Sequence, residues 1–242
     1  MLDLCSESGH GPEFRFETGD TVYFFLRQSK SGQFSIPTPT SGFDYIRGPM
    51  VAATFRHSYH KGPIPRTDYE LLMGAIFDNY HGKPYDVAPV KAYIGDKVGK
   101  APAKLNEEEQ ELFFMQTAAL ETIYHLRLDG FNEYAIKFLQ DTSTWHNQIS
   151  GARALRSTNN PAVHTALMSV VADTNRSTFV QVMCLESLQQ LHPKALKPRL
   201  LAALPNASKE ENSFGGNLMD PRMCTSLPSV KDAITKVLKT LD

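Results

Sequence analysis

Cysteine is scarce in this chain of 242 residues. The three cysteines, Cys5, Cys184 and Cys224, are far apart in the sequence and form no C-x-x-C pair. Three cysteines cannot all pair with one another, which excludes a disulfide scaffold. Cys184 lies in an apolar pattern of helical period and is predicted to be a buried thiol. A bridge between Cys5 and Cys224 stays open, and it would matter only in an oxidising compartment.

Long apolar runs and an excess of either charge are also absent. The densest apolar run, residues 22–26, has five residues, whereas a membrane-spanning helix needs about 18 or more. The 25 basic and 26 acidic residues give a net charge of −1. The molecule as a whole therefore has no field that would attract nucleic acid or anionic lipid. These absences predict a soluble protein without a transmembrane segment.

Catalytic and cofactor-binding motifs of recognised spacing are missing as well. The sequence contains no G-x-S-x-G, no P-loop, no G-x-G-x-x-G and no H-E-x-x-H. Each of these patterns places a nucleophile, a phosphate cradle or a metal ligand where the chemistry needs it. We therefore expect no cofactor, and the interpretation favours a non-enzymatic protein.

The first part of the chain has a β-rich pattern. Short runs of β-branched and aromatic residues are separated by glycines and prolines, which favour tight turns. The runs cover residues 14–16, 22–26, 34–36 and 51–55. This pattern predicts a small module of short antiparallel strands.

One helix is predicted after this module, over residues 67–81. Thr67 and Glu70 have the spacing of a capping box, and Gly82 stands where a glycine often ends a helix. Residues 83–104 are rich in proline and glycine, and we interpret them as a linker with one short strand near residues 90–94. The expected domains are therefore residues 1–100 and residues 101–242.

Helical periodicity dominates from Asn106 onward. Asn106 is a good N-cap, and three glutamates follow it in the first turn, as the helix dipole prefers. Further apolar stripes of helical period follow to the end of the chain. The predicted helices span residues 107–128, 132–140, 143–157, 161–172, 177–191, 193–204 and 230–241.

Two of these units align with each other at an offset of 32 residues. Asp141 aligns with Asp173, and Pro161 aligns with Pro193. Two helices with one apolar stripe each cannot bury those stripes alone, so such units must stack on neighbours. Residues 131–205 resemble the HEAT family in the spacing of these positions, which are Pro161, Leu167, Asp173, Val180, Cys184 and Leu188.

The HEAT resemblance implies an α-solenoid of paired antiparallel helices. Together with the β-rich module, it gives an expected α+β fold: a small N-terminal module with one helix, followed by a short HEAT-like solenoid. Residues 19–26 with residues 32–34 resemble a β-module of secreted bacterial proteins, in which a Gly-acidic turn precedes an aromatic strand. That resemblance favours a secreted or periplasmic location, with the signal removed, over the cytoplasm.

Three histidines are candidate metal ligands. His57 and His60 are three positions apart, and His81 ends the predicted helix. A turn at residues 58–59 would bring the first two imidazoles together, and zinc needs three or four such ligands. The alternative hypothesis is therefore an enzyme or metal-binding protein with a histidine site between the β module and the first repeat helices. Histidines also commonly lie at helix C-termini, where the dipole favours imidazolium.

Six basic residues on or near the repeat helices are candidates for an interaction surface. Residues 151–242 carry 11 basic and 7 acidic groups. No aromatic residues are interleaved for base stacking, which argues against nucleic acid. The leading hypothesis is a protein-protein interaction or scaffold protein that uses its helical-repeat surface to bind a protein partner. The six residues are Arg153, Arg156, Arg176, Lys194, Lys197 and Arg199.

Overall fold

The computed structural model describes residues 2–3, 17–35, 42–54, 61–213 and 226–241. The chain divides into two compact units. Unit 1 comprises residues 1–70 and 213–226, and unit 2 comprises residues 71–212 and 227–242. The division falls within the first helix, whereas the sequence placed a domain boundary near residue 100. Each unit is described separately below.

Unit 1 contains short strands, as the sequence predicted. The larger sheet is antiparallel in the order β2-β5-β6-β7, and the smaller one has the order β1-β4-β3. Residues 14–16, predicted as a strand, lie outside the described residues. The strands are β1 (Leu2–Asp3), β2 (Thr21–Phe24), β3 (Arg27–Gln28), β4 (Phe34–Ser35), β5 (Phe43–Arg47), β6 (Met50–Thr54) and β7 (Lys61–Pro65). Two further strands, β8 (Asn212–Ser213) and β9 (Ser226–Leu227), pair with each other.

A buried polar pair lies between the larger sheet and the first helix. The Tyr69 hydroxyl donates a hydrogen bond to Asp44 Oδ2 at 2.8 Å, and Asp44 is fully buried. The Tyr69 ring also stacks on Tyr23, with 5.1 Å between the ring centroids. Burial, followed by the charge of Asp44, raises the pKa of Tyr69 well above its ordinary value. The hydroxyl therefore stays protonated and remains a donor to the carboxylate.

The predicted helix at residues 67–81 is confirmed as α1 (Arg66–Tyr80). Gly82 follows with a φ of 66°, in the left-handed region that glycine adopts without strain. Its main-chain N–H bonds to Asn79 O at 3.1 Å, which closes the last turn. The first residues of α1 belong to unit 1 and the rest to unit 2.

The prediction that residues 83–104 form a linker is wrong. This segment contains a helix, α2 (Val87–Val98), whose N-cap residue Asp86 accepts a hydrogen bond from a main-chain N–H of the first turn. Pro89 lies in that first turn, where the missing N–H has no helical acceptor in any case. The apolar residues that face the core recur at helical period, and they are Val90, Ile94 and Val98. The described part of residues 1–100 therefore has two helices, where the sequence predicted one.

The remaining helices agree closely with the predicted spans. Predicted helices 132–140, 161–172 and 230–241 are reproduced to the residue. The α-helices are α3 (Gln110–Leu126), α4 (Asn132–Gln140), α5 (Trp145–Ala154), α6 (Pro161–Ala172), α7 (Thr178–Leu191), α8 (Lys197–Ala203) and α9 (Val230–Leu241). Short 3-10 turns extend α5 and flank α8: η2 (Leu155–Ser157), η3 (Lys194–Leu196) and η4 (Leu204–Asn206). The α+β class is therefore confirmed.

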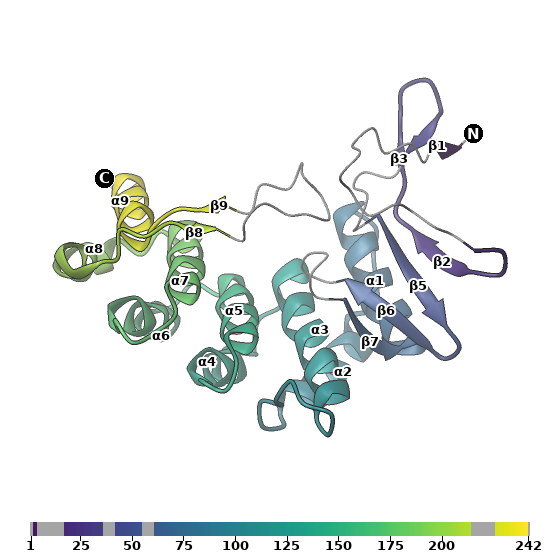
Figure 1. Ribbon diagram of the computed structural model, residues 1–242, viewed down its shortest axis with the longest axis horizontal. Helices are drawn as coiled ribbons and strands as arrows, with labels where there is room; N and C mark the ends of the chain where they lie inside the picture. Colours follow the sequence, from purple (N-terminus) through teal and green to yellow (C-terminus); the bar gives the residue numbers. More distant parts are fainter. Residues whose placement is uncertain (1, 4–16, 36–41, 55–60, 214–225, 242) are drawn as a thin grey trace. The chain divides into compact units, whose positions relative to one another are not determined.

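Helices α2 to α9 form two rows within unit 2 (Figure 1). In one row, α3, α5, α7 and α9 each contact the next. In the other, α4 contacts α6 and α6 contacts α8. Between the rows, α2 packs on α3, α4 on α5, α6 on α7, and α8 on α9. We refer to these eight helices as the helical array.

Buried glutamines join the two helices of three successive pairs. In each pair, a side-chain amide of the second helix donates to carbonyl oxygens at the C-terminal end of the first helix, where carbonyls lack helical partners. The bonds run from Gln116 to Lys97 O (3.1 Å) and Ala101 O (2.8 Å), from Gln148 to Asp141 O (2.7 Å), and from Gln181 to Val171 O (3.1 Å) and Asp173 O (2.9 Å). The glutamines are 32 and 33 residues apart.

Replacing Gln116 by methionine tests this role. Gln116 is fully buried and also accepts a hydrogen bond from Ala103 N at 2.8 Å. Methionine keeps the length of the side chain but leaves these main-chain groups unpaired, so we expect a loss of about 2 kcal/mol in the free energy of unfolding. Urea unfolding measures it. Gln190→Met, on an exposed position of α7, is the control, and an equal effect of both changes would contradict the role.

Candidate functional site

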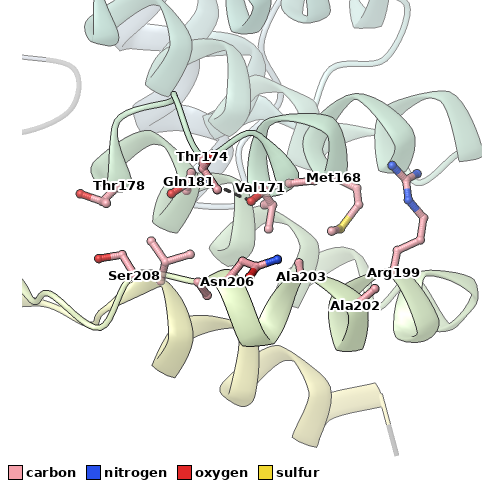
Figure 2. Close-up of a pocket in the computed structure, with 13 residues that line it drawn as sticks. Met168, Val171, Thr174, Thr178, Gln181, Arg199, Ala202, Ala203, Asn206 and Ser208 are labelled. Atoms are coloured by element: carbon pink, nitrogen blue, oxygen red, sulfur yellow. Dashed lines mark hydrogen bonds between the residues drawn. The ribbon is translucent and has the colours of Figure 1, made fainter.

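A groove in unit 2 opens among α6, α7 and α8 (Figure 2). Its volume is about 530 Å³. Most of the lining residues are small or apolar, and all lie within the helical array or in the segments that join its helices. They are Met168, Val171, Ala172, Thr174, Thr178, Gln181, Arg199, Ala202, Ala203, Asn206, Ala207, Ser208 and Val230.

The local sequence of α8 explains why space is left here. Pro193 precedes η3, and Pro198 is the second residue of α8, where a missing N–H costs nothing. The helix therefore begins only at Lys197 and ends at Ala203. Alanines on this short helix offer little volume toward α6, so the wall formed by α8 leaves a hollow.

Hydrogen-bonding groups lie along the groove from one end to the other. In Figure 2, the hydroxyls of Thr178 and Ser208 lie at one end, the Asn206 amide lies near the middle, and the Arg199 guanidinium lies at the other end. The Ser208 oxygen accepts a hydrogen bond from Glu210 N at 3.1 Å, so its proton is still available for donation. These groups can bind a ligand that carries both donors and acceptors.

Arg199 is the charged residue of the groove lining. It is exposed, and within the described part of the chain it forms no ion pair or hydrogen bond. Asn206 likewise has no side-chain hydrogen bond to another described residue. Both side chains are therefore available to a ligand.

Two of the predicted surface cations lie together on a neighbouring part of the array. Arg153 Nε is 2.8 Å from Glu121 Oε2, and Arg156 Nη2 is 3.1 Å from Glu186 Oε2. Both guanidinium groups lie over the Tyr124 ring, at 4.2 and 5.4 Å from its centroid. Their charges are thus already paired inside the protein, which leaves little for a ligand.

The other four predicted cations have different surroundings. Arg176 Nε is 3.3 Å from Asp173 Oδ2 in the turn between α6 and α7. Lys194 is exposed on η3, and Lys197 is half-buried at the start of α8. Of the six, Arg199 is the one in the groove lining. That the full set forms one interaction surface stays a prediction.

Of the three histidines proposed as metal ligands, the structure describes one, His81. His57 and His60 lie outside the described residues. His81 Nδ1 is 2.7 Å from Phe77 O, and its ring stacks on Phe77 at 4.0 Å. Among the described residues, no group of three or more His, Cys, Asp or Glu side chains is placed to hold a metal ion.

Cys184 is a buried thiol, as predicted. It has no exposed surface, and burial raises the pKa of its thiol to about 12. A thiol with such a pKa is a poor nucleophile near neutral pH, so Cys184 contributes packing and not chemistry. Cys5 and Cys224 lie outside the described residues.

Sequence reasoning missed most of the groove. Arg199 was named, but Thr178, Asn206, Ser208 and the alanines of α8 were not. The two prolines before α8 and the small residues at positions 202–203 were the available signal. That signal indicates that the helix is short. It does not indicate which neighbouring helix is left partly exposed by the short helix.

Within the described residues, no helix combines the length and the apolar character needed to cross a bilayer. Comparisons of the chain with protein-family models, with curated proteins and with solved structures find no match.

Proposed function

We propose that the protein is a non-enzymatic interaction protein whose helical array is a HEAT-like α-solenoid, and that its groove binds a short segment of a partner protein. Two observations support the HEAT-like interpretation. Successive helix pairs pack in two rows, and the buried glutamines at 116, 148 and 181 follow nearly the same offset as Asp141 and Asp173. Stacked helix pairs of this type present extended surfaces to partners.

The groove is the observation that carries the binding proposal. Its volume of about 530 Å³ falls within the range of about 300–1,000 Å³ that is typical of ligand sites. Apolar walls with a few separate polar groups are the usual composition of such sites. Arg199 and Asn206 supply polar groups that no other described residue uses.

The chemistry of the lining favours binding over catalysis. The lining includes no His, Cys, Asp, Glu or Lys. The hydroxyls of Thr178 and Ser208 therefore have no general base among the lining residues that could activate them as nucleophiles. A guanidinium, an amide and two hydroxyls can hold a ligand in place, but they do not form a proton-transfer pair.

Filling the groove tests the proposal. Ala202 is exposed and lines the groove, so Ala202→Trp should occupy the space without entering the core. The probe is a phage library of short random peptides, each joined to the coat protein at both of its ends. Phages that bind the full chain are selected from this library. Selected peptides should bind Ala202→Trp at least about tenfold more weakly, which corresponds to about 1.4 kcal/mol.

The matched control is Ala195→Trp. Ala195 is also exposed, but it lies on η3 and is not part of the lining. Equal thermal unfolding midpoints for the two variants would show that both are folded. Peptides that bind Ala202→Trp as well as they bind the unchanged chain would refute the groove as the binding site.

A further inference from the structure

The charge of the groove narrows the class of its ligand, and this step rests on the proposed function. We infer that the bound segment carries one aspartate or glutamate side chain, whose carboxylate pairs with Arg199 while neighbouring apolar residues pack between α6 and α8. The groove would then recognise an acidic segment within a partner protein.

Arg199 differs from the arginines of the neighbouring helices. Arg153, Arg156 and Arg176 each have a carboxylate partner within 3.3 Å. Arg199 has none among the described residues, and the groove lining includes no acidic residue. A guanidinium beside an apolar wall favours a planar anion that accepts two parallel hydrogen bonds, and a carboxylate has that geometry.

A single cation also limits the charge of the ligand. Nucleic acid carries a negative charge at every nucleotide, and its binding draws on several lysines or arginines at once. This lining supplies one charge, and the whole chain has a net charge of −1. The groove therefore matches one carboxylate among uncharged neighbours much better than it matches a phosphate backbone.

The rest of the lining suits a main chain beside that carboxylate. A peptide presents one N–H donor and one carbonyl acceptor at nearly every residue. The Asn206 amide can donate and accept at once, and the hydroxyls of Thr178 and Ser208 lie at the end of the groove opposite Arg199. Met168 also lines the groove, and an apolar side chain of the ligand can pack against it.

The test uses the same peptide selection on the full chain, with Arg199→Glu as the variant. Peptides selected by the unchanged protein should be enriched in aspartate and glutamate beside apolar residues. Because a charge-assisted hydrogen bond is lost and a repulsion added, their affinity for Arg199→Glu should fall roughly tenfold or more. Selection on Arg199→Glu itself should instead enrich lysine and arginine.

The control is Lys194→Glu, which reverses an exposed cation outside the lining and should leave the affinity unchanged. Suppose that Ala202→Trp blocks the selected peptides, but that they are not enriched in acidic residues and bind Arg199→Glu normally. This result would overturn the inference and leave the proposed function standing. If Ala202→Trp blocked none of the selected peptides, both would be overturned. If labelled oligothymidylate bound the unchanged protein at physiological salt but did not bind Arg199→Glu, the ligand group would be a phosphate and not a carboxylate.

Discussion

Replacing Arg153 by methionine is expected to lower the free energy of unfolding by about 3–5 kcal/mol, because it leaves a buried carboxylate without its counter-ion. Glu121 has no exposed surface, and Arg153 Nε contacts both of its carboxylate oxygens, at 2.8 and 3.1 Å. Among the described residues, the hydrogen bond from the Ser150 hydroxyl at 3.1 Å is what remains to Glu121 in the variant. Urea unfolding followed by circular dichroism measures the loss.

The double variant Glu121→Gln with Arg153→Met separates the two contributions to that loss. It removes the buried charge as well as its partner, so we expect it to recover more than half of the stability lost in Arg153→Met. The packing of the arginine over Tyr124 would still be missing. If Arg153→Met alone lowers the free energy of unfolding by less than about 1 kcal/mol, the Glu121 carboxylate does not need Arg153 as a buried counter-ion.

The substitution Gly151→Ala is expected to cost about 3 kcal/mol or more, because the new methyl group meets main-chain atoms that cannot move aside easily. A Cβ at this position of α5 would lie 2.7 Å from Leu139 N and 2.8 Å from Ala135 O of α4. The two helices would have to separate, which would also loosen the contacts of neighbouring residues. The same urea unfolding measurement applies.

Gly95→Ala is the matched control. Gly95 also lies within a helix, α2, but a Cβ there has no atom within 4 Å. Alanine has a higher helix propensity than glycine, so this change should raise the free energy of unfolding by about 0.5–1 kcal/mol. If the two glycine variants shifted stability in the same direction, close approach of α4 and α5 would not explain the glycine at 151.

Helix positions could be predicted where local chemistry determines them. Asn160 caps α6 by accepting a hydrogen bond from Val163 N at 2.9 Å, and Pro161 is its first residue. Both signals are visible in the sequence, and α6 was predicted to the residue. The helix α2 was missed because the prolines and glycines of residues 83–104 were interpreted as a linker, although a proline such as Pro89 is tolerated in a first turn.

The surroundings of the candidate site residues depend on packing between helices, which periodicity does not reveal. Arg153 and Arg156 were predicted as surface cations, yet each pairs with a glutamate of an adjacent helix. Glu121 and Arg153 are 32 residues apart, which equals the offset found for Asp141 and Asp173. Opposite charges at that spacing were a usable signal for the pairing. Nothing comparable in the sequence indicated that Arg199 would have no ion-pair partner among the described residues.

The buried polar bonds also determine which parts of the array can open independently. Gln181 ties the end of α6 to α7, so α6 cannot leave α7 without exposing unpaired carbonyls. Successive pairs are joined by buried groups as well, because Arg153 of α5 pairs with Glu121 of α3, and the Ser187 hydroxyl of α7 donates to Ala152 O of α5 at 2.8 Å. Opening the array between two pairs therefore also leaves buried polar groups without partners. We expect the helices that these bonds join to open together, and their main-chain amides to exchange with solvent at similar rates in the native state.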